Sequence, residues 1–142
     1  MTTPAPPPAE TERGLLDTSV VIDLDQIDPG WLPREAAVTA LTLAELTAGP
    51  HATDDAAERA RRQERLQRAE AAFDPLPFDD QAARAYGRIY TATRERSRKA
   101  RDARAIDLLI AAVALANDLP LFTRNAADFQ HLDKVGLHIH PI

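Results

Sequence analysis

Short apolar runs alternate with longer helical patterns along this chain, and this alternation limits the folds open to it. Runs that are typical of buried strands lie at residues 14–16, 37–40, 121–123 and 137–140, with a further short extended segment at 75–78. Strands that alternate with helices form a mostly parallel sheet with helices on both faces. The sequence therefore predicts an α/β fold with a mostly parallel central sheet.

Length and composition favour one folded domain. The chain has 142 residues, of which 44% are hydrophobic, enough to bury one core but too few for two ordinary domains. Residues 1–13 hold four prolines among Ala, Thr and Glu, so we expect a disordered tail there and a single domain at 14–142. A net charge of −5 argues against a purely electrostatic nucleic-acid coat protein.

The chain has no cysteine, which rules out a disulfide framework and a thiolate metal site and fits a reducing compartment. Its longest apolar run, at residues 108–116, is well short of a membrane span, and the N-terminal residues lack the pattern of a secretory signal. We therefore expect a cytoplasmic protein without a membrane partner.

Four carboxylates stand just after the predicted strands or in a helix near such a point: Asp17, Glu45, Asp107 and Asp128. The carboxyl ends of parallel strands meet at one crevice, so acids that are distant in sequence can converge there. Clustered carboxylates repel one another unless a counterion lies between them, and oxygen ligands suit a hard divalent cation. The sequence therefore predicts a metal site made of these acids.

Three of the four acids also have a purely local explanation. Asp17 could cap the helix that follows it, as Asp often does where a strand turns into a helix. Glu45 could complete a capping box that begins at Thr42. Asp128 could occupy the first turn of a helix that Asn125 caps, where the helix dipole favours an acid.

Asp107 is harder to explain locally. A helix is expected at 106–116 with Asp102 as the better cap, which puts Asp107 about a turn and a half inside an apolar helix. A carboxylate there costs stability unless something pairs with it. The structural alternative to a metal is an ion pair with Arg104.

Other chemistry has weaker support. His138 and His140 would point the same way on a strand, but a third zinc ligand at useful spacing is missing. There is no glycine-rich phosphate loop, and Ser19 lacks the sequence of a nucleophile elbow. The basic stretch with Arg98, Arg101 and Arg104 is either a solvated connector or, if the acids hold metal, a binding surface for RNA phosphates.

One helical face is richer in aromatic residues than a solvated helix needs. It carries Ala82, Tyr86, Ile89 and Tyr90 at helical spacing. We expect part of this face to lie at or beside a homodimer contact.

These motifs, taken in order, resemble those of a known family. They are Leu-Leu-Asp17-Thr18-Ser19, Thr-x-x-Glu45-Leu, Ile-Asp107-Leu-Leu-Ile-Ala-Ala and Thr123-Arg-Asn125-Ala-Ala-Asp128-Phe. Together they look like the motifs of PIN-domain ribonucleases, and the short length is similar to the VapC toxins of bacterial VapBC toxin–antitoxin pairs. The resemblance runs from about residue 14 to the C-terminus, and the Pro-rich extension before it departs from the usual pattern.

The resemblance implies a three-layer α/β/α sandwich with about five strands, and an endoribonuclease that uses Mg²⁺ or Mn²⁺. The implied substrate is RNA, either tRNA or rRNA, whose cleavage inhibits translation and growth. The implied partners are a second copy of the chain in a homodimer and a cognate VapB-like antitoxin. The metal-binding and catalytic acids would be Asp17, Glu45, Asp107 and Asp128, supported by the polar residues Thr18, Ser19, Thr123 and Asn125.

Two other function classes share part of this pattern. A receiver-like phosphoacceptor domain also places an aspartate and a threonine at strand ends, but it needs an acidic pair at the first strand and a lysine at the last. The lysines here, Lys99 and Lys134, do not follow a suitable strand. A catalytically inactive PIN-like module that binds RNA or protein is the other alternative, and the full set of acids argues against it.

Overall fold

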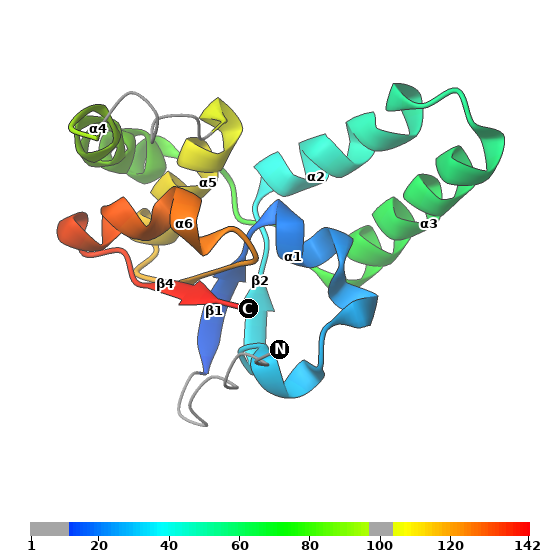
Figure 1. Ribbon diagram of the computed structural model, residues 1–142, viewed down its shortest axis with the longest axis horizontal. Helices are drawn as coiled ribbons and strands as arrows, with labels where there is room; N and C mark the ends of the chain where they lie inside the picture. The colour runs from blue at the N-terminus through cyan, green and yellow to red at the C-terminus, as the bar shows by residue number, and fades with distance from the viewer. Residues whose placement is uncertain (1–11, 97–103) are drawn as a thin grey trace.

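The computed structural model describes residues 12–96 and 104–142, in which helices cover both faces of one β-sheet (Figure 1). The strands are β1 Arg13–Leu16, β2 Glu35–Ala37, β3 Leu121–Thr123 and β4 Ile139–Pro141. The α-helices are α1 Thr18–Ile22, α2 Ala40–Ala48, α3 Ala56–Ala72, α4 Asp80–Arg94, α5 Ala105–Ala116 and α6 Ala126–Phe129. Short 3₁₀ helices are η1 Leu24–Gln26, η2 Pro29–Trp31, η3 Gly49–Ala52 and η5 Gln130–Val135.

The sheet is parallel throughout, with strand order β2-β1-β3-β4. This confirms the predicted fold class, although about five strands were expected and the described residues form a sheet of four. The segment at 75–78 contributes only an isolated parallel bridge, between Leu76 and Thr39. Pro75 and Pro77 flank Leu76 and have no N–H to donate, so the ladder cannot extend on either side.

Neighbouring residues of the two central strands point to opposite faces of the sheet and begin two separate cores. Leu15 and Leu121 pack with α4 and α5 on one face. Leu16 and Phe122 pack on the other face against residues of α1, α2 and α3. All four side chains are fully buried, so the strand ends are held firmly on both sides.

The aromatic face of α4 belongs mostly to the core. Ala82 and Ile89 have no exposed surface and pack with α5, while Tyr90 is 51% exposed. The apolar character of this face is therefore explained largely by packing within the chain. The homodimer stays a prediction, and Tyr90 is the residue of this face that could take part in it.

Helices α2 and α3 run beside each other as a hairpin, and α2 also contacts α5 (Figure 1). Helix α3 buries Leu66 and Ala69 against the sheet side and exposes most of its charged residues, as its sequence pattern predicts. In the part of the chain that the structure describes, no helix has the length and apolar character needed to cross a membrane.

Candidate active site

The two central strands bring their carboxyl ends together and place Asp17 beside Thr123. Leu16 of β1 pairs with Phe122 of β3, and the backbone N–H of Asp17 donates to the carbonyl oxygen of Phe122 at 3.0 Å. One residue further along each strand, the Thr123 hydroxyl donates to Asp17 Oδ2 at 2.6 Å. Residues 106 positions apart are thereby joined at the predicted edge of the sheet.

The second carboxylate oxygen of Asp17 also accepts hydrogen bonds. Ser19 Oγ donates to Asp17 Oδ1 at 2.5 Å, and the backbone N–H of Val20 donates to the same oxygen at 3.2 Å. The second contact makes Asp17 the N-cap of α1, which begins at Thr18, earlier than the sequence pattern indicated. The capping explanation is therefore correct, but it accounts for only one of the three hydrogen bonds that Asp17 accepts.

The environment of Asp17 disfavours its negative charge. The residue is 2% exposed, and this burial raises the pKa of its carboxyl above the ordinary value. The hydrogen bonds that Asp17 accepts lower the pKa, and the nearby charge of Asp107 raises it. Among residues 12–96 and 104–142, no Lys or Arg forms an ion pair with Asp17. A buried carboxylate that has hydrogen-bond donors but no positively charged partner is stabilised in its ionised form by a cation beside it.

Glu45 lies in the middle of α2, where it takes no part in capping. The N-cap is Thr39, whose hydroxyl accepts from the N–H of Thr42 at 3.1 Å. The capping box predicted from Thr42 to Glu45 is therefore wrong, because the helix begins at Ala40, within the residues assigned to the preceding strand. The carboxylate of Glu45 instead accepts a hydrogen bond of 2.6 Å from the Thr18 hydroxyl.

Asp107 also lies elsewhere in its helix than expected. Helix α5 begins at Ala105 with Arg104 as its N-cap residue, so Asp107 lies in the first turn. Its predicted cap, Asp102, lies outside the described residues. The Asp107 side chain is only 17% exposed, although it is at a helix end. The ion pair with Arg104 considered as a structural alternative is present, with Arg104 Nη2 3.3 Å from Asp107 Oδ1.

Arg104 joins two of the predicted site acids. Its Nη2 also lies 3.0 Å from Glu45 Oε2, so one guanidinium nitrogen contacts carboxylates from α2 and α5. These contacts raise the pKa of Arg104 above its ordinary value, chiefly through the hydrogen bond with Asp107. Of the predicted RNA-binding residues, Arg98 and Arg101 lie outside the described residues.

Asp128 lies in the first turn of α6 and is exposed. Its carbonyl oxygen accepts from Arg96, but no hydrogen bond or ion pair of its side chain occurs in the described structure. Within the described ranges, no group of three or more acid or imidazole side chains is close enough to hold a metal ion as a set. The structure thus connects Glu45 and Asp107 through Arg104 and Glu45 to the segment of Asp17 through Thr18, whereas the Asp128 side chain has no described contact with them.

The supporting polar residues divide in the same way. Thr18, Ser19 and Thr123 each donate to a site carboxylate. Asn125 contributes its backbone N–H, which donates to Thr123 Oγ1 at 3.0 Å, whereas its side chain makes no cap hydrogen bond. The histidine pair has another role, because the ring of His140 stacks on Phe122 with centroids 4.4 Å apart.

A cavity of about 430 Å³ opens beside Glu45. Its polar lining includes Thr18, Ser19, Glu45, Glu58, Arg62, Arg65 and Arg104. The arginines of α3 were not singled out from the sequence, where they belong to an ordinary charged helix. Only the hairpin of α2 and α3 turns them toward the site.

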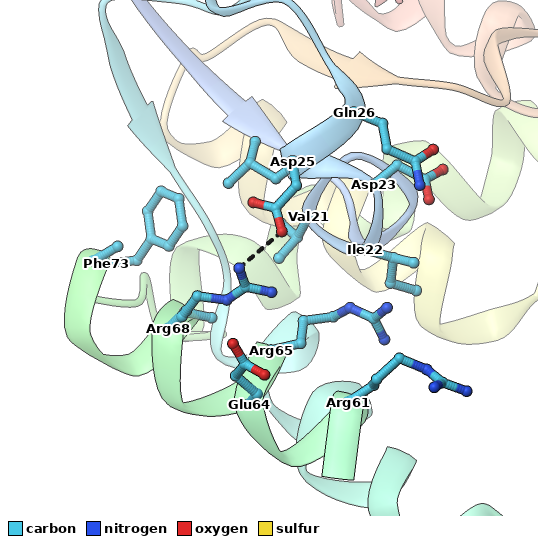
Figure 2. A pocket seen from close by; sticks show the side chains of 13 residues that line it. Val21, Ile22, Asp23, Asp25, Gln26, Arg61, Glu64, Arg65, Arg68 and Phe73 are labelled. Carbon is cyan, nitrogen blue, oxygen red and sulfur yellow. Dashed lines mark ion pairs between the residues drawn. The ribbon is translucent and has the colours of Figure 1, made fainter. Parts of the chain in front are cut away.

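A second cavity continues from the first along α1 and α3, and the two share Ile22 and Arg65. Figure 2 shows the side chains of Arg61 and Arg65 extending from α3 past Ile22, and the ion pair of Arg68 with Asp25, at 2.8 Å. Of the predicted site acids, Glu45 lines the first of these adjoining cavities, and arginines of α3 line both.

The fold agrees with comparisons to known proteins. The PIN domain profile matches residues 14–135. Ribonuclease VapC5 of Mycobacterium tuberculosis is 40% identical over 123 residues, which are 84% of this chain and 87% of that protein.

Solved structures give the same result. The VapBC-5 toxin–antitoxin structure from Mycobacterium tuberculosis contains a chain that matches with a TM-score of 0.79 and 38% identity, covering 92% of this chain and 98% of that one. A chain of VapBC2 from Rickettsia felis, bound to a promoter DNA fragment, has the same fold at 20% identity, with a TM-score of 0.73 over 92% of this chain and 98% of that one.

Proposed function

Because the chain belongs to the PIN-domain family and, within it, to the VapC ribonucleases, we propose that its acidic site is the active site of a metal-dependent endoribonuclease. The observation that carries the proposal is Asp17, a nearly fully buried carboxylate at the carboxyl end of β1 that has three hydrogen-bond donors but no cationic partner in the described structure. Asp107 and Glu45 lie in the adjoining helices and complete an all-oxygen set of side chains.

The donor set fits Mg²⁺ or Mn²⁺. Carboxylate oxygens are the ligands that these hard cations prefer. Burial disfavours the charge on Asp17, and a cation bound beside it would stabilise that charge. We assign Asp17, Asp107 and Glu45 as the residues that would hold the ion, and Asp128 as a further proposed ligand. When bound, such an ion lowers the pKa of water and stabilises the charge that builds on a scissile phosphate.

The residues of the chain then have distinct roles. Ser19 and Thr123 fix the two oxygens of Asp17, and Thr18 fixes Glu45. We assign Glu45 to hold and deprotonate the attacking water, because it is oriented by one hydroxyl and faces the cavity. Arg62 and Arg65 line the same cavity and are suited to bind phosphates of the substrate.

We further propose the biological setting of a VapBC system. The relatives with the same fold were solved as toxin–antitoxin complexes, which supports a cognate VapB-like antitoxin as partner. The proposed substrate is tRNA or rRNA in the cytoplasm, so that cleavage stops translation and growth. A homodimer is proposed from the family, with Tyr90 as the exposed aromatic residue of α4.

The test is cleavage of structured RNA by the purified chain. We expect cleavage with Mg²⁺ or Mn²⁺, loss of cleavage with EDTA and recovery when the ion is restored in excess. The alternative of an inactive PIN-like binding module predicts RNA or protein binding without cleavage under every metal condition. RNA-end sequencing of the products would then identify the bond that is cut.

A further inference from the structure

Arg104 occupies the space between two proposed site carboxylates. Its Nη2 is 3.0 Å from Glu45 Oε2 and 3.3 Å from Asp107 Oδ1, and its Nε is 3.4 Å from Asp107 Oδ2. A Mg²⁺ or Mn²⁺ ion needs carboxylate oxygens at about 2.0–2.2 Å in a compact arrangement. The guanidinium and such an ion therefore cannot use the same pair of oxygens at the same time.

The arginine is the exchangeable member of this group. Its side chain is 63% exposed, whereas those of Glu45 and Asp107 are each 17% exposed. Glu45 is held by the Thr18 hydroxyl and by its place in the middle of α2, and Asp107 by the first turn of α5. Arg104 stands at the N-cap position of α5 with an extended backbone, and its side chain makes no cap hydrogen bond. An exposed ion pair of this kind is weak and is easily exchanged.

We propose that Arg104 is an internal competitor of the divalent cation, so that the cation must displace its guanidinium from Glu45 and Asp107 in order to bind. In the metal-free protein Arg104 neutralises part of the acid charge and lines the same cavity as Glu45. The affinity of the site for the ion is thereby set lower than its carboxylates alone would give. This inference rests on the proposed function, since it takes the acids to be a cation site.

The experiment measures Mn²⁺ binding to the full chain by isothermal titration calorimetry, with free Mn²⁺ followed in parallel by electron paramagnetic resonance. Arg104→Gln removes the competitor, and we expect its dissociation constant for Mn²⁺ to be at least ~5-fold lower than that of the wild type, the lower range of a typical coupling between two sites. Arg104→Lys keeps the charge but cannot bridge two carboxylates with a planar fork, and should bind with intermediate affinity.

Arg62→Gln is the matched control. Arg62 lines the same cavity and carries the same charge, but it pairs with Glu58 and with the Gly49 carbonyl, not with the site acids.

If Arg104→Gln and Arg62→Gln tighten Mn²⁺ binding equally, the effect is general electrostatics and the competition is refuted. Equal affinities of wild type and Arg104→Gln, with Mn²⁺ bound by both, refute the competition but leave the proposed function intact. No Mn²⁺ binding by any variant overturns both. If Arg104→Gln does not fold, as judged by circular dichroism, the comparison of Arg104→Lys with wild type decides.

Discussion

At the scale of single residues, the structure separates the four predicted acids into different environments. Asp17 is buried and accepts three hydrogen bonds, Glu45 and Asp107 share Arg104, and Asp128 is exposed. The proposed chemistry therefore depends most on Asp17 and Glu45. Asp128 is the acid for which the geometry gives the least support, although it stays a proposed ligand.

Glu45→Gln should lower RNA cleavage at least ~100-fold, because Gln can accept the Thr18 hydrogen bond but cannot take a proton from water. In the metal-free protein the Glu45 carboxylate is paired with Arg104. Removal of its charge is therefore not expected to raise the free energy of unfolding by relieving repulsion between the site acids. The lost ion pair is largely exposed on the arginine side, and the free energy of unfolding should change by no more than about 1 kcal/mol.

The matched control is Glu70→Gln, which changes an exposed acid of α3 that lines neither cavity. It should cleave RNA at the wild-type rate. A Glu45→Gln variant with wild-type cleavage would leave a site of three acids.

The metal-free stability should depend on the protonation of Asp17. Its pKa in the folded state is raised, so the native state binds this proton more readily than the unfolded state. The contribution of Asp17 to stability is therefore favourable at low pH and is lost as the pH rises from the ordinary carboxyl range through the raised pKa.

Asp17→Asn lacks this dependence. In EDTA, the free energy of unfolding of Asp17→Asn minus that of the wild type should increase as the pH rises through this window, measured by urea denaturation at each pH. A difference that stays constant or decreases with pH would show that burial does not disfavour the charge on Asp17.

At the scale of elements, the two central strands were predictable. The edge strand β2, which was expected at 37–40, lies at Glu35–Ala37, and the helix starts were also harder to predict. The runs Leu15-Leu16 and Leu121-Phe122 are apolar on both sides, as strands buried on both faces must be, and Asp17 follows β1 directly. Helix starts depend on which Thr or Asp provides the cap, and the sequence offers several. Thr39 and Thr42 both match a cap, and only the bridge of Thr39 with Leu76 fixes the choice.

Arrangements that depend on tertiary packing were not predictable. The arginines of α3 reach the cavity only because α2 and α3 form a hairpin. Pattern alone also could not decide whether the apolar face of α4 packs inside the chain or against a second one. The buried Ile89 and the exposed Tyr90 are adjacent in sequence and show how narrow that distinction is.

The corrected cap of α2 gives a prediction about stability. Thr39→Ala removes a fully buried hydroxyl that accepts from the N–H of Thr42, and should destabilise the protein by about 1–2 kcal/mol. Thr47→Ala is the control, because that exposed hydroxyl only donates to a carbonyl within the same helix and should change little. Urea denaturation of both variants measures the difference, and equal stabilities would argue against Thr39 as the cap.

At the scale of the whole molecule, the parallel sheet explains how distant segments form one site. The order β2-β1-β3-β4 places β1 and β3 in the centre, so that the residues following them meet, while α2 and α5 bring Glu45 and Asp107 to the same end. This arrangement brings four separate parts of a short chain to the site proposed for a metal-dependent nuclease.

The oligomeric state is a separate property of the whole molecule. We expect a homodimer of the full chain in solution, and Tyr90→Asp should weaken it by placing a charge on the exposed part of the α4 face. Phe78→Asp is the control, since it changes an exposed aromatic residue before α4. Light scattering at micromolar concentration measures the mass. A monomeric wild-type chain would contradict the expectation.

The central claim is that Asp17 is part of a metal-dependent ribonuclease site, and the most direct measurement is RNA cleavage by the wild type and Asp17→Asn over a range of Mn²⁺ concentrations. Both proteins should have the same circular dichroism spectrum. The account predicts cleavage by the wild type that rises with Mn²⁺ and saturates, and a rate for Asp17→Asn at least ~100-fold lower at every concentration. Cleavage by a folded Asp17→Asn at the wild-type rate would contradict the account.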